Sequence, residues 1–189
     1  MVQRPTLPEA SAGEAVLLAD DVAEQSTTAL FLDDLWVGQR FTSVSSRIDE
    51  AEIKAFAARY DPQPFHLDEC AARASLFGGL AASGWHTAAL SMRLLVDSLP
   101  IAGGVIGASG ELAWPRPTRP GDMLTVETTV LDVVSSKSRP DRGFATLRSE
   151  TRNQAGEPVQ IFTMKLVVPR RPAPAEVSGP ANSREATAQ

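Results

Sequence analysis

The six residues 61–66, with the sequence DPQPFH, place a carboxylate and an imidazole five positions apart with two prolines between them. A proline disfavours the helical conformation at the residue before it, so the backbone at Asp61 and Gln63 is expected to be extended or turning. Asp61 and His66 would then be held on a stiff, non-helical turn, which suits a preorganised acid–base pair. The same spacing also fits an ordinary loop after a helix, with a solvated Asp61 and a capping His66.

The residues before this turn predict the helix that leads into it. Asp49 suits an N-cap, and Glu52 three positions later completes a capping box. The residues at the i, i+3, i+4, i+7 spacing of one buried helix face are Ile53, Phe56, Ala57 and Tyr60. Because the proline turn follows, this helix is expected to end near Tyr60. After the turn, Asp68 is expected to cap a short helix that runs to Ser75.

A second helix is expected over residues 85–98, between Gly84 and Pro100. Its side chains are apolar or small nearly all round, and Arg93 is its only charged residue before the last turn. A helix of this kind is buried on most of its circumference. His86, in its first turn, is expected to pack against neighbours rather than to catalyse.

The pattern after this helix is typical of long strands. Strands are expected at about 105–114, 121–136, 143–153 and 158–168, with an earlier one at 41–48. The residues expected to share inward faces are Leu124, Val126, Val130 and Val134 in one strand and Phe162, Met164, Leu166 and Val168 in another. Turn residues at 139–143 and 153–158 predict antiparallel hairpins. One buried helix with about five such strands implies an α+β fold, a sheet curled around the helix, called a hotdog.

The composition is that of one globular domain with flanking tails. The chain has 189 residues and a net charge of −5, so it can bury one good core and carries no basic stripe for nucleic acid. Residues 1–30 and 169–189 lack apolar content and are expected to be disordered, which leaves a domain over 31–168. No apolar run is long enough to span a membrane or to form a signal-peptide core, so a cytoplasmic protein is expected.

The cysteine and histidine counts limit other kinds of site. A single cysteine, Cys70, excludes an internal disulfide and is expected to be a small buried residue. The only histidines are His66 and His86, which argues against an all-protein zinc site. No metal is therefore expected.

The motif YDPQPFHLD at residues 60–68, followed by 71–72 (Ala-Ala) and 83–84 (Ser-Gly), resembles the signature of the MaoC-like dehydratase family, which includes the (R)-specific enoyl-CoA hydratases. Residues 114–122 are similar to the family's strand–turn–strand, and the resemblance covers about 35–168. It implies the hotdog fold and reversible conversion of a trans-2-enoyl thioester to an (R)-3-hydroxyacyl thioester. Coenzyme A would enter as part of the substrate, with no other cofactor.

The resemblance also implies roles for particular residues. The family's aspartate and histidine, matching Asp61 and His66, hold and activate water and move protons. Which of the two is the formal base stays open, because a coupled pair shares its titration. The glycine matching Gly84 donates its backbone N–H to the thioester carbonyl. The first turn of a helix suits this role, because its N–H groups have no intrahelical acceptor and its dipole favours negative charge.

Other positions are candidates for substrate binding. Gln63 stands where the family usually has Asn, and Ser83 stands where it commonly has His, so this chain departs from the family pattern at both. The basic residues that are candidates for the phosphates of coenzyme A are Arg116, Arg119, Lys137, Arg139 and Arg142.

Other functions are left open by the sequence. One is a hotdog thioesterase, although that class lacks the Asp-Pro-x-Pro-x-His turn. Another is a dehydratase for carrier-protein thioesters or for a branched dicarboxylic acyl-CoA. The third is a non-catalytic subunit that completes another chain's site. A homodimer or an assembly of dimers is expected, because a single curled sheet leaves an edge strand exposed.

Overall fold

The computed structural model describes residues 28–172, and the rest of both predicted tails lies outside the described residues. In chain order the elements are the 3₁₀ helix η1 (Leu32–Asp34), β1 (Arg40–Thr42), β2 (Ser46–Arg47), α1 (Glu50–Tyr60), α2 (Pro64–Leu67), α3 (Glu69–Arg73), α4 (Gly84–Ser98), β3 (Ile106–Ala113), β4 (Met123–Ser135), β5 (Arg142–Arg152) and β6 (Pro158–Pro169). The strands pair antiparallel in the order β1-β4-β5-β6-β3, and β2 pairs with β4.

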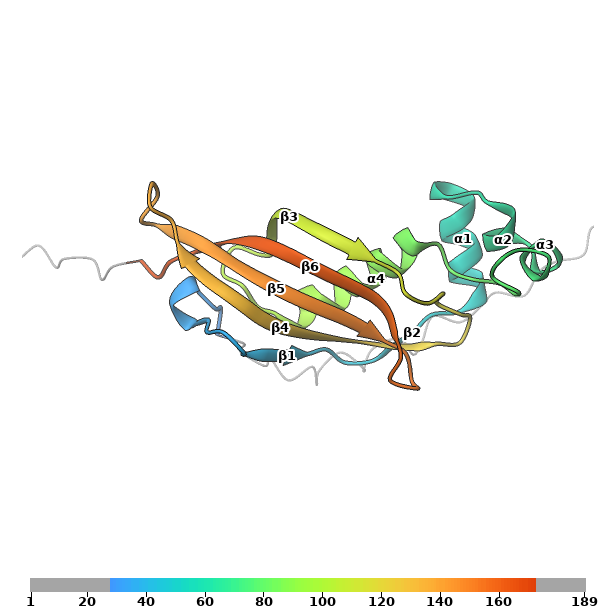
Figure 1. Ribbon diagram of the computed structural model, residues 1–189, viewed down its shortest axis with the longest axis horizontal. Helices are drawn as coiled ribbons and strands as arrows, with labels where there is room; N and C mark the ends of the chain where they lie inside the picture. The colour runs from blue at the N-terminus through green and yellow to red at the C-terminus, as the bar shows by residue number, and fades with distance from the viewer. Residues whose placement is uncertain (1–27, 173–189) are drawn as a thin grey trace, which may run out of the picture.

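The long helix α4 lies along one face of this sheet. Figure 1 shows β4, β5 and β6 side by side, with α4 beside them and α1, α2 and α3 gathered near one end. This is the single α+β hotdog domain that the sequence pattern predicts, and the four long strands lie within a few residues of their predicted bounds. Within residues 28–172, no helix is both long enough and apolar enough to cross a membrane.

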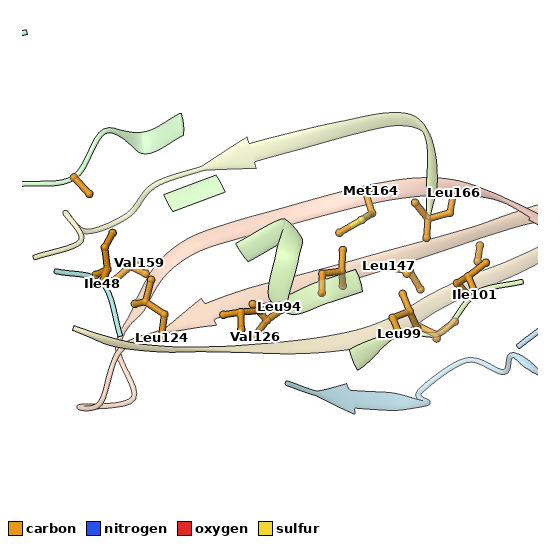
Figure 2. Close-up of a cluster of buried hydrophobic side chains, with 14 of the residues drawn as sticks. Ile48, Leu94, Leu99, Ile101, Leu124, Val126, Leu147, Val159, Met164 and Leu166 are labelled. Carbon is orange, nitrogen blue, oxygen red and sulfur yellow. The ribbon is translucent and has the colours of Figure 1, made fainter. Parts of the chain in front are cut away.

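The core fills the space between α4 and the sheet. Leu94 and Leu95 on the inner face of α4 are buried. They belong to one apolar cluster with inward-facing strand residues, of which Figure 2 labels Val126, Leu147, Met164 and Leu166. Burying one side chain of this size contributes about 1.5–3 kcal/mol relative to leaving it exposed, so this layer holds α4 in place.

The capping box predicted for the first helix is present. Asp49 Oδ1 accepts from the Glu52 N–H at 2.8 Å, and Glu52 Oε2 accepts from the Asp49 N–H at 3.1 Å. Ile48 and Ile53, on either side of this cap, are fully buried, so the start of α1 is fixed to the core. The helix ends at Tyr60, as the prolines predict.

Two strand predictions are wrong, and each error comes from a shift in register. The strand predicted at 41–48 is two short strands, because between Thr42 and Ser46 it carries one residue more than β4 does opposite it. A second shift follows Val130 in β4, and Val134 is therefore 48% exposed instead of sharing the inward face. Successive side chains of a strand point to opposite faces of the sheet, so an inserted residue moves every later side chain to the other face.

The prediction that the second helix is buried on most of its circumference is also wrong for the single chain. Thr87 and Leu94 on its inner face are buried, but Trp85, Met92 and Val96 are 62%, 39% and 46% exposed. The apolar composition predicts that these side chains prefer burial, but one curled sheet covers only one side of α4. The outer face of α4 is therefore apolar and exposed.

Both ends of the described chain pair beyond the predicted bounds of the domain. Leu30 forms a parallel bridge with Ile101. After β6, Arg170 lies 2.6 Å from Asp33, and Arg171 similarly pairs with Asp34 at 2.7 Å. The two ion pairs hold the start of the domain against its end, and the bridge holds Leu30 against the segment after α4.

Cys70 is exposed on α3, contrary to the prediction that it is buried. Ala72, two positions later, is fully buried instead. Because residues two apart point in roughly opposite directions on a helix, only one of them can face the core.

Candidate active site

The proline turn places Asp61 and His66 on either side of a bend. Asp61 ends α1 with φ of −151° and ψ of 67°, and Gln63 is extended, with φ of −84° and ψ of 141°. Pro64 then starts the short helix α2, a position where a missing N–H costs nothing. The stiff bend is as predicted, but His66 lies on this helical turn and not on non-helical backbone.

His66 is held in one orientation by a backbone carbonyl from a distant part of the chain. Its side chain is 5% exposed, and Nδ1 lies 2.8 Å from the carbonyl oxygen of Ala81. A carbonyl can only accept, so Nδ1 carries the proton and the neutral ring has an acceptor at Nε2. That nitrogen faces Asp61 Oδ2 at 3.4 Å. The pair predicted from the sequence is thus formed, with the basic nitrogen toward the carboxylate.

Asp61 accepts hydrogen bonds from the two residues at which the chain departs from the usual pattern of the family that it resembles. Ser83 Oγ donates to Oδ2 at 2.7 Å, and Gln63 Nε2 donates to Oδ1 at 2.7 Å. Burial by itself would raise the pKa of Asp61, but these two hydrogen bonds and the nearby His66 hold that pKa below its ordinary value. The carboxylate is therefore ionised at neutral pH.

The first turn of α4 brings a free backbone donor beside this pair. Ser83 is the N-cap, and its Oγ accepts from the Trp85 N–H at 3.2 Å while donating to Asp61. Among residues 28–172, no acceptor is hydrogen-bonded to the Gly84 N–H. This donor points away from the helix body, at the positive end of its dipole. One serine thus joins the carboxylate to the helix terminus.

Trp114 explains why residue 84 is a glycine. A Cβ on Gly84 would lie 2.8 Å from Cε2 and 2.9 Å from Cδ2 of the Trp114 indole, closer than real contacts allow. The loop that carries Trp114 is fixed to the segment before α4, because the Ala82 N–H donates to the carbonyl of Thr118 at 2.9 Å. Trp114 is not among the site residues predicted from the sequence. Its only signal was an aromatic residue placed just before the Pro-rich turn.

These groups line one open cavity of about 700 Å³. Its walls include Asp61, Gln63, His66 and Gly84, together with Phe77, Trp85, Trp114 and Arg116. Ser83 is fully buried behind the wall and acts through Asp61. Within residues 28–172, no group of three or more His, Cys, Asp or Glu side chains gathers to hold a metal ion.

The basic residues predicted to meet phosphates are placed very differently. Arg116 is half exposed on the cavity wall, 3.4 Å from Glu157. Arg119 also reaches the cavity, but its guanidinium donates to the carbonyls of Phe77, Gly79 and Leu80, so it braces that loop.

The other three candidates, Lys137, Arg139 and Arg142, belong to the β4–β5 hairpin. Figure 1 shows that this hairpin lies at the end of the sheet opposite α1, α2 and α3. The chain therefore does not bring them to its own cavity.

His86 packs, as predicted. Its ring stacks on Phe56 with centroids 4.6 Å apart and an interplanar angle of 4°. Burial lowers the pKa of His86, with partial opposition from the charge of Glu52. The stacked ring is therefore neutral at pH 7.

A second, smaller cavity of about 210 Å³ lies between α4 and the sheet. Trp85 lines both cavities, and the next turns of α4 supply Ala88, Ser91 and Met92 to the smaller one. Leu112, Gln160 and Phe162 line it from β3 and β6. An apolar group that enters beside Gly84 and follows α4 would arrive here.

Comparison with known proteins agrees with this arrangement. The model of the FAS1-like dehydratase domain region matches residues 35–162. A solved structure, the MaoC-like dehydratase from Rhodospirillum rubrum, is 66% identical with a TM-score of 0.75, covering 77% of this chain and 100% of that one. The R-hydratase PhaJ1 from Pseudomonas aeruginosa is 30% identical with a TM-score of 0.60, covering 76% and 88%.

A curated relative, the (R)-specific enoyl-CoA hydratase of Rhodospirillum rubrum, is 30% identical over 142 residues, covering 75% of this chain and 93% of the relative. The family match spans most of the described domain and includes the residues that form the Asp61–His66 bend and the start of α4. The chain belongs to the FAS1-like dehydratase domain family and is a hotdog protein of the MaoC-like dehydratase type.

Proposed function

We propose that this protein is a hydro-lyase that interconverts a trans-2-enoyl thioester and an (R)-3-hydroxyacyl thioester, with coenzyme A as the carrier. The proposal rests on one observation, the convergence of the Asp61–His66 pair and the free Gly84 N–H on one cavity. Hydrating an enoyl thioester needs a group that takes a proton from water, a group that protonates the α carbon, and a donor for the enolate oxygen. Relatives named (R)-specific enoyl-CoA hydratase and 3-hydroxybutyryl-CoA dehydratase support it.

Asp61 and His66 are suited to hold the reacting water. The 3.4 Å between Oδ2 and Nε2 is longer than an ordinary N–H···O bond, so both atoms keep capacity to accept from a water on the cavity side. The Nδ1–H bond to Ala81 keeps Nε2 unprotonated in the neutral ring. A water that donates one hydrogen to each atom directs an oxygen lone pair into the cavity.

The reaction then balances as an addition of water. The water oxygen bonds to C3 of the enoyl group, its O–H bond breaks, and the proton passes to the Asp61–His66 pair. The C2=C3 electrons move toward the thioester oxygen, which accepts from the Gly84 N–H. The pair returns a proton to C2 and the thioester carbonyl re-forms. Dehydration follows the same steps in reverse.

The cavities suggest where the rest of the substrate lies. We assign the coenzyme A phosphates to Arg116, which is half exposed at the cavity wall, and not to Arg119, whose guanidinium is engaged by backbone carbonyls. The acyl chain is assigned to the 210 Å³ cavity, which is lined along α4 from Trp85, the residue after Gly84, to Leu95.

The test is hydration of a panel of trans-2-enoyl-CoA esters, followed by loss of the conjugated absorbance and chiral analysis of the product. Asp61→Asn and His66→Gln are each expected to lower kcat by about 10²–10⁴ with the fold intact, the usual effect of losing a general acid or base. A variant that keeps more than roughly a third of the wild-type rate would refute the assignment of that residue. Free thiol released from saturated acyl-CoA, with no hydration, would indicate a thioesterase instead.

We also propose that the protein works as a homodimer joined along β3. Among residues 28–172 this strand pairs only with β6, so its outer edge has backbone groups that no described strand pairs. Beside it lies the exposed apolar face of α4, and a groove of about 260 Å³ between the two elements is lined by Met92, Val105 and Ala108 among others. A second copy would cover both features at once, with β3 pairing against its own copy across a two-fold axis.

A further inference from the structure

Gln160 is a buried polar side chain in the second cavity, whose lining is mostly apolar. It is 3% exposed and lies directly opposite Thr151 in the β5–β6 ladder. Directly paired residues of antiparallel strands point to the same face, and the Thr151 hydroxyl donates to Ser91 of α4 at 2.7 Å. Gln160 therefore points inward, toward α4 and the cavity that it lines.

The orientation of the Gln160 amide is fixed by Trp114. The Trp114 Nε1–H lies 3.0 Å from the amide oxygen Oε1. Because an indole nitrogen can only donate, the atom facing it must be the oxygen, and the NH₂ group must occupy the other side of the amide. Among residues 28–172, no acceptor is hydrogen-bonded to this Nε2. The buried amide thus has two N–H donors available.

The hydroxyl groups near this amide already have hydrogen-bond partners. Thr151 donates to Ser91, and the hydroxyls of Thr128 and Ser149 lie 2.8 Å apart. A fully alkyl ligand that fills the cavity would therefore cover the Gln160 donors without pairing them. An unsatisfied buried donor costs about 1–3 kcal/mol, a factor of roughly 5–150 in affinity. An oxygen on the ligand would remove this cost.

That oxygen should be uncharged. None of the residues that line the cavity is charged, so a carboxylate there would have an amide donor but no cation. Burying an ionised carboxylate without a charged partner costs far more than one hydrogen bond returns. A ketone, ether or hydroxyl oxygen needs no such partner. This argues against the branched dicarboxylic acyl group that the sequence leaves open.

The cavity volume limits where the oxygen lies along the acyl chain. An apolar cavity of about 150 Å³ accepts benzene. The cavity here, about 210 Å³, therefore holds a chain segment on the order of six carbons. Gln160 accepts a hydrogen bond from Trp114, whose indole lies against Gly84, so its amide stands near the entrance to this segment.

We propose that Gln160 is a specificity-determining residue that selects acyl groups with an uncharged hydrogen-bond acceptor a few carbons beyond the double bond. The inference rests on the proposed hydration of enoyl thioesters and adds to it the class of acyl group. Trp114 positions the amide, and Nε2 donates to the acceptor.

The experiment compares trans-2-octenoyl-CoA with analogues in which one methylene at C5, C6 or C7 is replaced by an ether oxygen or a carbonyl. Wild-type protein is expected to hydrate at least one oxygen analogue with a kcat/KM about 10-fold or more above that of the alkyl ester, as expected for a site with a donor to satisfy. Gln160→Met, which keeps the length of the side chain without its donors, is expected to lose this preference. Trp114→Phe, which keeps the amide but removes the indole bond that orients it, is expected to weaken the preference without abolishing it.

Each other result has one meaning. Equal kcat/KM for all the esters in wild type overturns the inference while leaving the hydratase assignment intact. An equal loss by Gln160→Met on alkyl and oxygen-containing esters also overturns it, because Gln160 would then only hold Trp114. Failure of the wild-type protein to hydrate any ester refutes the proposed function itself.

Discussion

Asp61 is the residue on which the polar contacts of the site converge. Its Oδ1 accepts from Gln63, its Oδ2 accepts from Ser83, and the same Oδ2 faces His66. A carboxylate that accepts several hydrogen bonds is kept ionised and in one orientation. The two residues at which this chain departs from its family's pattern therefore act on a single group.

Ser83→Ala tests that arrangement, because it removes one donor from Asp61. The hydrogen bond favours the ionised carboxylate, so its loss raises the pKa of Asp61 and moves the acidic limb of the kcat/KM profile to higher pH. A hydrogen bond to a charged group contributes about 1.5–3 kcal/mol, so kcat/KM is expected to fall roughly 10–100-fold. Gln63→Met should shift the same limb in the same direction. An unmoved acidic limb in Ser83→Ala would show that the serine serves only as the cap of α4.

Gly84 can be tested with two substitutions that share one steric effect. Both Gly84→Ala and Gly84→Pro add a Cβ that meets the Trp114 indole at about 2.8 Å, but only proline also removes the N–H. Alanine is thus the control for proline, and kcat for the proline variant is expected to be about 10²–10³ lower than for the alanine variant. Proline is tolerated at the first helical position, and circular dichroism checks folding. Equal kcat values for the two would place the oxyanion donor elsewhere.

At the scale of elements, α4 supplies the site with its N-terminus and the core with its inner face. The loop before it, residues 77–80, is held by Arg119 from the segment between β3 and β4. This loop carries Phe77 to the cavity wall. The arginine therefore shapes the cavity through backbone carbonyls.

Arg119→Met is expected to lower stability, because three carbonyls lose their donors. A loss of about 1–3 kcal/mol, at roughly 2–4 °C per kcal/mol for a chain of this size, gives a fall in Tm of several degrees. Arg116→Met is the matched control: it loses one exposed ion pair, so its Tm should change little while KM for acyl-CoA rises. Thermal melts and steady-state kinetics separate the two. A large fall in Tm for Arg116→Met, with a rise in KM for Arg119→Met, would exchange the roles assigned to the two arginines.

At the scale of the whole molecule, an apolar face and an open sheet edge lie together on one side. Light scattering at micromolar concentration is expected to give about twice the 20.2 kDa chain mass. Val96→Glu, on the exposed face of α4, should weaken this dimer, because it would place a charge in an apolar interface. Val44→Glu is the control and should not weaken the dimer, because Val44 is 74% exposed between β1 and β2, at the opposite edge of the sheet from β3. A monodisperse wild-type monomer would contradict the proposed assembly.

The sequence by itself determined the features that depend on neighbours along the chain. The capping box at Asp49, the end of α1 before the prolines and the bounds of the long strands all follow from local spacing, and all are present. The pairing of Asp61 with His66 also came from local geometry, since only five positions and a stiff bend separate them. Local conformation and short-range contacts do not require knowledge of how distant segments pack.

Only the tertiary structure decided the contacts between segments far apart in the chain. Ala81 fixes the tautomer of His66, Trp114 dictates the glycine at position 84, and Arg119 braces a loop that no spacing rule connects to it. The register shift after Val130 likewise reversed the predicted face of the rest of β4. These contacts depend on pairing register and side-chain packing across the fold, and a single inserted residue changes both. The periodicity of one strand does not show where such an insertion falls, because an insertion is defined only relative to the partner strand.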